Sequence, residues 1–299
     1  MKKQKTKFVC TSCGYESLRW LGKCPECSTW NSMQEEVVEE NKTHKKSAVL
    51  KSPSVYTFSD ISAHETERHK TGLEEFDRVL GGGLVPGSVV LIGGDPGIGK
   101  STLVLQSAAG IGAKVLYISG EESLKQIKLR ADRLKISSSN ISLASETELN
   151  TILHSVTAES PAVLIVDSIQ TTYNAALENA PGTVTQIREC TAVLLDDAKR
   201  KGYAVLLIGH VTKDGYIAGP KLLEHVVDTV IQFEPETGGN YRILRAIKNR
   251  FGSTNEIGIF EMTGAGLREI SNPSEIFLSD KIGEVSGSVV TAAVEGTRP

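Results

Sequence analysis

The stretch Gly94-Asp-Pro-Gly-Ile-Gly-Lys100-Ser101 decides the fold of this chain. It matches the pattern G-x4-G-K-S, follows the apolar run Val89–Ile92 and precedes a helical pattern that begins at Lys100. Glycines at these spacings allow backbone N–H groups to curl around phosphates, and the helix N-terminus adds its positive dipole end. The stretch therefore predicts a nucleotide-binding loop between a buried strand and a helix.

The roles within this loop follow from the chemistry of its side chains. Lys100 should reach the β- and γ-phosphates of ATP, and the hydroxyl of Ser101 should bind Mg²⁺. Thr102 should support the α-phosphate side. We expect the nucleotide to contact Gly94, Asp95, Pro96, Gly97, Ile98, Gly99, Lys100, Ser101 and Thr102.

Around the loop, short apolar runs alternate with helical patterns from about Tyr56 onward. This alternation is typical of an α/β fold, in which helices cover both faces of a parallel sheet. Strands are predicted at Ser88–Ile92, Lys114–Ser119, Ala162–Asp167, Tyr203–His210 and Thr229–Glu234, with an antiparallel edge at Tyr241–Arg250 and Glu256–Met262. Helices are predicted at Lys100–Gly110, Ser123–Leu134, Thr147–Thr157 and Val184–Lys201.

The last of these helices has its own local signals. Thr183 followed by Gln186 predicts a capping box at its start. Cys190 falls on its apolar face, so we expect a small core residue there rather than a nucleophile.

Asp167 ends a run, Ala162–Val166, that is apolar at every position and typical of a strand buried on both faces. An acidic residue at this end of a strand can hold Mg²⁺, and a helix cap is the alternative. Two predicted strands, Lys114–Ser119 and about Ile141–Ala144, separate Lys100 from Asp167 along the chain. We expect one of them to lie between the two site strands in the sheet.

ATP hydrolysis also needs a group that orients and deprotonates water. Glu121 and Glu122 follow the strand Lys114–Ser119, at the sheet edge where the phosphates should lie. We assign Glu121 as the general base, with Glu122 as the alternate; both could instead simply begin the next helix. His210, at a strand end, is a possible γ-phosphate sensor or a solvated side chain.

Four of the five cysteines form two CxxC pairs with ten residues between them: Cys10, Cys13, Cys24 and Cys27. Four thiolates suit a closed tetrahedral Zn²⁺ site, which would be structural rather than catalytic. Iron in a rubredoxin-like site and two disulfides are the alternatives. Gly14 and Gly22 should ease the turns, and Trp20 and Trp30 should form a small apolar cover or a partner-binding surface.

The chain of 299 residues has 33 basic and 36 acidic side chains, so its net charge of −3 excludes a broadly basic surface but not a local basic channel. Its longest uncharged stretch, Val79–Gly94, is 16 residues long and contains Pro86, too short for a membrane span. The lysines of Met1–Cys10 are followed by no apolar run, so a secretory signal is not expected. We expect a cytoplasmic protein without a membrane partner.

Three strings resemble a known family. Thr71–Leu84 resembles the opening segment of RecA/KaiC-like ATPase cores, and Tyr117–Ser123 resembles the catalytic-glutamate segment of RecA-like proteins. The string Lys248-Asn-Arg-Phe-Gly252 resembles the KNRFG motif of the bacterial RadA/Sms family. A four-cysteine module ahead of the ATPase core has the same order as in that family, and the resemblance covers about Lys7 to Pro299.

The resemblance implies a RecA-like P-loop ATPase core preceded by a zinc finger, with ATP, Mg²⁺ and Zn²⁺ as cofactors. It implies a DNA-dependent, helicase-like ATPase of recombination and DNA repair. Family members form hexameric rings on single-stranded and branched DNA and promote branch migration with RecA, similarly to a DnaB-type helicase. The domains expected are 1–33, zinc finger; 34–55, linker; 56–273, RecA-like ATPase; and 274–299, the start of a truncated domain similar to the Lon protease.

Residues two apart in a strand face the same side, so Lys248 and Arg250 should project together, with Asn249 facing away. The two cations could reach a neighbouring subunit's γ-phosphate as trans fingers; a solvated edge strand is the alternative. Loops after the Asp167 and His210 strands should face the ring channel, where Lys213 could pair with phosphate and Tyr216 could stack on a base. Ordinary loop polarity is the other interpretation.

Two other functional classes remain open. A KaiC-like regulatory or signalling ATPase without DNA translocation would share the nucleotide site, but it gives less reason for the cysteine module and the KNRFG string. A non-enzymatic adaptor would use the cysteine module for recruitment and would not depend on Lys100.

Overall fold

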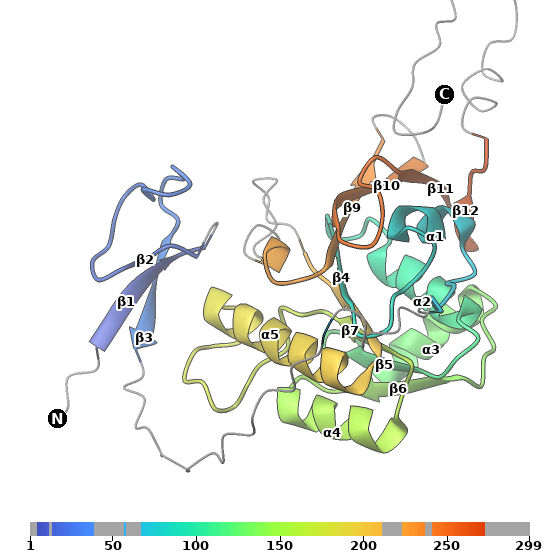
Figure 1. Ribbon diagram of the computed structural model, residues 1–299, viewed down its shortest axis with the longest axis horizontal. Coiled ribbons are helices and arrows are strands. Elements are labelled where there is room, and N and C mark those ends of the chain that lie inside the picture. Colours follow the sequence, from blue (N-terminus) through green and yellow to red (C-terminus); the bar gives the residue numbers. More distant parts are fainter. Residues whose placement is uncertain are drawn as a thin grey trace, which may run out of the picture.

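The computed structural model describes residues 5–11, 14–38, 57, 67–210, 223–236 and 241–272. These residues form a three-stranded sheet near the N-terminus and a nine-stranded sheet in the remainder of the chain (Figure 1). Cys13, Lys213, Tyr216, most of the expected linker and the expected domain start at 274–299 lie outside the described residues.

The large sheet has the strand order β12-β11-β10-β9-β4-β8-β7-β5-β6. Its six parallel strands are β4 (Val89–Gly94), β5 (Val115–Ser119), β6 (Ile141–Ser145), β7 (Val163–Asp167), β8 (Ala204–Ile208) and β9 (Thr229–Pro235). An antiparallel edge follows, formed by β10 (Tyr241–Asn249), β11 (Ile257–Thr263) and β12 (Gly266–Glu269). The predicted parallel sheet with an antiparallel edge is confirmed.

Helices cover both faces of this sheet (Figure 1). Val90 and Ile92 of β4 pack in one core with the helices α1 to α3, whereas Val89 and Leu91 pack in a second core with α4 and α5. This division explains why β4 is buried at every position. The helices are α1 (Glu74–Leu80), α2 (Lys100–Gly110), α3 (Leu124–Arg133), α4 (Leu149–Glu159) and α5 (Val184–Lys201).

The start of α5 differs from the prediction. Thr183 is the N-cap, but its hydroxyl donates to the carbonyl of Ala180, and it makes no side-chain cap hydrogen bond. The Gln186 side chain instead accepts from Asn174 N and donates to Asn179 O, each at 2.8 Å. The predicted capping box is therefore wrong, because the preceding loop takes the side chain that would close it. Cys190 lies fully buried on the inner face of α5, as expected, and burial raises the pKa of its thiol to about 12.

The N-terminal module is a sheet of β1 (Lys5–Cys10), β2 (Glu16–Ser17) and β3 (Met33–Val38), with β1 in the centre. Residues 34–38, which we expected to begin the linker, pair with β1 as far as Lys5 and Val38. The module has a very small core, centred on Cys10, Cys24 and Met33.

Trp20 and Trp30 do not cover this core, because their exposed fractions are 54% and 69%. The prediction of an apolar cover is wrong: the described side chains packed against the buried cysteines and Met33 are Phe8, Leu21 and Cys27, and neither indole is among them. Among the described residues, no helix is both long and apolar enough to cross a membrane.

Candidate nucleotide site and metal centre

The loop that follows β4 has the backbone of a phosphate cradle. Gly97 and Gly99 have φ angles of +80° and +115°, in the left-handed region that favours glycine. A Cβ atom on Gly99 would also lie 2.5 Å from Cε of Met262. The Met262 side chain could move aside, so it is the positive φ angle that favours glycine at the turn into α2, whose N-terminal amides point into the loop.

Lys100 lies inside this loop and is almost fully buried. Its Nζ donates to the carbonyl oxygens of Gly94 at 2.6 Å and Asp95 at 2.9 Å. Burial lowers the pKa of Lys100, while the charges of Asp167, Asp95 and Glu121 act in the opposite direction. Phosphate oxygens form stronger hydrogen bonds with an ammonium than neutral carbonyls do, so a nucleotide can take over these contacts.

Asp167 ends β7 and is buried beside the same loop. The fully buried hydroxyl of Tyr117 donates to Asp167 Oδ2 at 2.7 Å, which orients the carboxylate. Burial raises the pKa of Tyr117 well above its ordinary value, so this phenol remains a donor at neutral pH. No helix begins between Ser168 and Thr183, all of which are described, so Asp167 does not cap one.

One strand separates β4 from the Asp167 strand, as expected, but it is β8 and neither of the two strands that we predicted. β8 comes after Asp167 in the chain and pairs in parallel with both β4 and β7. β5 and β6 lie beyond β7 instead. His210 follows β8, so it lies at the same edge of the sheet as the nucleotide loop and Asp167.

Glu121, just past β5, contacts Ser168 and His210 at this edge of the sheet. Its Oε1 atom accepts a hydrogen bond from Ser168 Oγ at 2.5 Å and lies 2.9 Å from His210 Nε2. The bond with His210 is the main cause that lowers the pKa of Glu121 to about 2; Ser168 contributes in the same direction, against the effect of burial. The carboxylate is therefore ionised and held in place.

Glu122 points elsewhere, although it is the next residue. Its carboxylate forms an ion pair with Arg130 of α3, and its backbone N–H donates to Ser119 Oγ at 2.9 Å. Only the first glutamate of the pair thus joins His210 and Ser168 at the sheet edge.

Sequence reasoning missed two residues that orient this site, Tyr117 and Ser168. The pairing of Ser119 with Asp167 across β5 and β7 brings the segments after both residues together. Gly120 is needed for this approach, because a Cβ atom there would lie 2.1 Å from Thr171 Oγ1. In the sequence, Gly120 is the one signal that could have indicated this close approach.

The KNRFG string lies near the amino-terminal ends of β4 and β9, whereas the nucleotide loop follows the carboxyl-terminal end of β4. Lys248 Nζ donates to the carbonyls of Glu224 at 2.5 Å and Val227 at 2.8 Å, and Arg250 Nη1 pairs with Asp228 Oδ1 at 3.2 Å. Asn249 turns the opposite way and donates to Val79 O of α1. The two cations therefore share a side, as residues two apart should.

Strand register fixes how far these cations are from the nucleotide loop. Asn249 pairs with Thr229, which in turn pairs with Val90 near the start of β4, whereas the loop begins at the last residue of β4. The four-residue step from Val90 to Gly94 is about 13 Å along the strand, and the contacts of Lys248 and Arg250 with Glu224, Val227 and Asp228 hold both side chains at its far end. Lys248 and Arg250 lie too far away to act on a nucleotide bound to their own chain.

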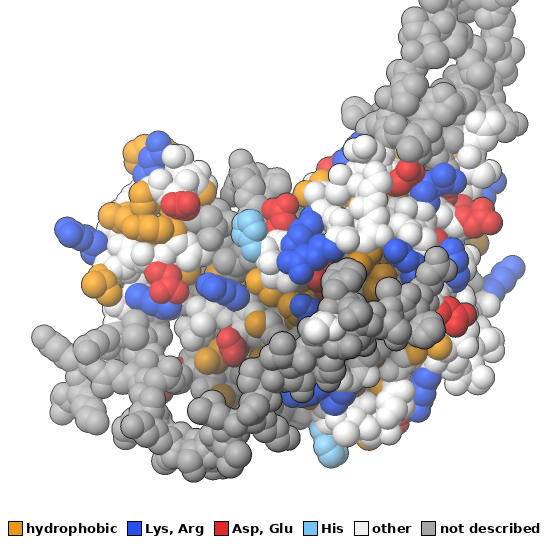
Figure 2. Space-filling model, in the orientation of Figure 1, with side chains coloured by type: hydrophobic (Ala, Val, Ile, Leu, Met, Phe, Trp, Pro, Cys, Tyr) orange, Lys and Arg blue, Asp and Glu red, His pale blue; other side chains and the backbone are white. Residues whose placement is uncertain are grey.

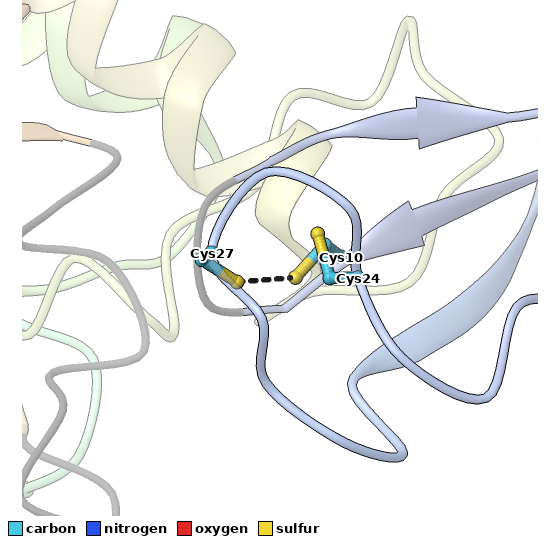
Figure 3. Close-up of side chains that lie close together, drawn as sticks. All are labelled: Cys10, Cys24 and Cys27. Carbon is cyan, nitrogen blue, oxygen red and sulfur yellow. Dashed lines mark hydrogen bonds between the residues drawn. The ribbon is translucent and has the colours of Figure 1, made fainter.

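The cysteine module brings Cys10, Cys24 and Cys27 together, with sulfur atoms within 4.8 Å of one another (Figure 3). The Sγ atoms of Cys10 and Cys27 are 3.6 Å apart, close to the ~3.8 Å expected for two thiolates on one tetrahedral zinc. Two matching turns hold these residues: Gly14 N donates to Cys10 O, and Ser28 N donates to Cys24 O.

Gly14 and Ser28 take the left-handed conformation in these turns, with φ angles of +76° and +60°. The second turn therefore uses Ser28 rather than Gly22. Three converging thiolates fit Zn²⁺, and Cys13 remains the predicted fourth ligand outside the described residues.

Comparisons with known proteins agree with both sites. Residues 57–216 match the family model described as AAA domain, and residues 8–35 match the rubredoxin metal binding domain. The crystal structure of the RadB recombinase superposes with a TM-score of 0.54 at 24% identity, covering 67% of this chain and 99% of that one, which shows a shared fold. The ATPase domain implies ATP and Mg²⁺, and the cysteine module implies Zn²⁺.

Curated relatives match the chain over its whole length. It is 54% identical to DNA repair protein RadA of Bacillus subtilis, with 100% of this chain and 67% of that protein aligned. It is 48% identical to DNA repair protein RadA of Pseudomonas aeruginosa, again over 100% of this chain and 67% of the relative. The chain thus spans about two thirds of the length of these relatives.

Proposed function

Because this chain belongs to the RadA family, whose curated members are DNA repair proteins, we propose that it is a DNA-dependent ATPase acting in recombination and repair. The observation that carries the proposal is the grouping of Lys100, Asp167 and Glu121 where three parallel strands end. A cation, a buried carboxylate and an ionised carboxylate at one such edge are what phosphoryl transfer to water requires.

In the proposed reaction, the backbone of residues 94–102 binds the phosphates of ATP, and Lys100 neutralises charge on the β- and γ-phosphates. Ser101 and Asp167 would hold Mg²⁺, which when bound neutralises charge on the phosphate oxygens. Tyr117 keeps the Asp167 carboxylate in one orientation. Glu121 accepts a proton from the attacking water, while Ser168 and His210 position its carboxylate.

We propose that hydrolysis is completed by a neighbouring subunit in a hexameric ring. The position of Lys248 and Arg250, at the opposite end of the sheet from the nucleotide loop, supports action in trans. Arg250 is the better finger, because its side chain is half exposed, whereas Lys248 donates to two carbonyls of its own chain.

We take the DNA substrate, the branch-migration activity and the RecA partner from the family resemblance. The ring would act on single-stranded and branched DNA, similarly to a DnaB-type helicase, and promote branch migration with RecA in the cytoplasm. Lys213 and Tyr216 stay predicted DNA contacts, and His210, which precedes their loop, would sense the γ-phosphate. We keep the domain assignment proposed from the sequence, with the zinc-binding module extended through β3 to Val38.

The decisive experiment measures ATP hydrolysis with and without single-stranded DNA, together with strand displacement and the native mass of the assembly. Single-stranded DNA should stimulate hydrolysis, and Lys100→Ala should abolish it. Lys114→Ala is the matched control, because that lysine forms only a surface ion pair with Glu159. An equal rate of hydrolysis with and without DNA would instead identify a KaiC-like regulatory ATPase. Repair activity that survives Lys100→Ala would identify an adaptor.

A further inference from the structure

Two indole side chains on the zinc-binding module are exposed to solvent. Trp20 and Trp30 are more than half exposed, and Leu18 beside them is 88% exposed. Hydrophobic side chains are visible on the surface of this module, with basic side chains next to them (Figure 2). Exposed aromatic surface of this kind marks a binding site, because burying it is favourable.

The module holds these indoles in defined positions. Lys23 and Trp30 form an antiparallel bridge, and Asn31 N donates to Gly22 O at 2.8 Å. A Cβ atom on Gly22 would lie 3.6 Å from the Trp20 ring and 4.0 Å from the Trp30 ring, so the two indoles flank the same backbone position. The adjacent metal centre fixes this hairpin, and a preorganised surface binds with a smaller entropic cost.

Cations accompany both rings. Lys23 Nζ lies 5.8 Å from the centroid of the Trp30 ring, and Arg19 directly precedes Trp20. Residues 18–33 contain these two cations and a single carboxylate, Glu26. Lysine is depleted from the centre of protein–protein interfaces, whereas sites for single-stranded nucleic acids combine aromatic rings with cations that follow the phosphates.

We propose that Trp20 and Trp30 form a stacking platform for the bases of single-stranded DNA, with Lys23 and Arg19 contacting its phosphates. The proposal rests on the proposed function in taking DNA as the substrate, and it adds a contact outside the ATPase core. Stacking tolerates any base, so the platform should bind DNA without sequence preference.

The composition of the chain makes the test direct, because Trp20 and Trp30 are its only two tryptophans. Intrinsic tryptophan fluorescence of the full, zinc-loaded chain therefore reports on this platform alone. Adding oligothymidylate should quench the emission, and added salt should reverse the quenching. Trp20→Phe and Trp30→Phe, examined singly, identify which indole stacks.

Affinity for a labelled oligothymidylate, followed by fluorescence anisotropy, provides the second readout. Trp20→Ala and Trp30→Ala should each raise Kd by about tenfold. Basal ATPase without DNA and zinc content should stay unchanged, which shows that each variant folds. Tyr15→Ala, a partly exposed aromatic outside the residue 18–33 hairpin, is the control and should leave Kd unchanged.

The outcomes separate this proposal from the proposed function. If DNA binds and stimulates hydrolysis while tryptophan emission and the Kd of the alanine variants stay constant, the platform is wrong and the DNA-dependent ATPase stands. If no DNA binds by anisotropy, the proposed function fails as well. Emission that responds to added RecA but not to DNA would show that the surface docks a protein and would overturn the proposal.

Discussion

His210 Nε2 lies 2.9 Å from Glu121 Oε1, although 89 residues separate them in the chain. The contact exists because β8 and β5 end at the same edge of the sheet, one on each side of β7. It joins the residue that we assign as the general base to the residue that precedes the predicted DNA-binding loop.

The two adjacent glutamates should behave differently when each is replaced. Glu121→Gln should lower kcat for ATP hydrolysis by about 10²–10⁴-fold, because the carboxylate that accepts the proton is lost. Glu122→Gln weakens only an ion pair with Arg130, so kcat should change by less than about fivefold. Phosphate release gives kcat, and binding of a fluorescent ATP analogue should be equal in both variants. A larger loss for Glu122→Gln would reverse the assignment.

Removing His210 should change the acidity of Glu121. In His210→Ala, the pKa of Glu121 should rise from about 2 toward its ordinary value of 4.5, because the main interaction that lowers it is gone. A depressed carboxyl pKa stabilises the fold above about pH 4.5 and loses that contribution as the pH falls toward 2. When the pH is lowered, the variant should therefore unfold at a higher pH than the parent protein does.

Carbon-13 NMR titration of the glutamate carboxyl groups measures this shift. His154→Ala, which removes an exposed histidine from α4, is the control and should leave the pKa of Glu121 in place. A Glu121 pKa that stays near 2 without His210 would contradict the assignment of its cause.

The trans-finger proposal predicts complementation between two inactive variants. Arg250→Ala should lower kcat by about 10³-fold or more, and Lys100→Ala should be inactive through loss of phosphate binding. In mixed rings, a Lys100→Ala subunit supplies its intact Arg250 to an Arg250→Ala neighbour, so about a quarter of the activity should return. Arg268→Ala, whose side chain only pairs with Glu261 on the surface, should keep full activity. Mixed rings that assemble but stay inactive, or an active monomer, would exclude catalysis in trans.

The cysteines should divide into two chemical classes. Chelation of the metal should expose four thiols to iodoacetamide at pH 8, while Cys190 stays unmodified until the protein is denatured. With a pKa of about 12 the Cys190 thiol is ionised in only about one molecule in 10⁴ at that pH, and it is fully buried. Mass spectrometry counts the modified residues.

Two results would change this interpretation. Four cysteines that stay protected after chelation would indicate disulfides, and visible absorption of the native protein would indicate iron in the place of zinc. Modification of Cys190 together with the others would show that α5 does not pack as described.

Much of the fold follows from local patterns. The predicted bounds of α2 and α5 agree with the structure, because glycines lie at or near both ends of each helix: Gly99 and Gly110 for α2, Gly182 and Gly202 for α5. The short helix α1 and strand β12 were missed, since seven and four residues hold too little periodic signal. Gly81 illustrates a signal that only contacts explain: a Cβ there would lie 2.9 Å from Gly252 Cα, so the glycine run packs against the KNRFG string.

The sequence by itself determined the nucleotide loop, the alternation of strands and helices and the cysteine spacing, because each depends on residues that are close along the chain. Only the tertiary structure decided that β8 separates the two site strands, that Glu121 rather than Glu122 faces His210, and that Trp20 and Trp30 are exposed. It also placed Lys248 and Arg250 away from their own nucleotide loop. These outcomes depend on strand order, register and packing volume, which arise from contacts between distant segments and leave no periodic trace in the sequence.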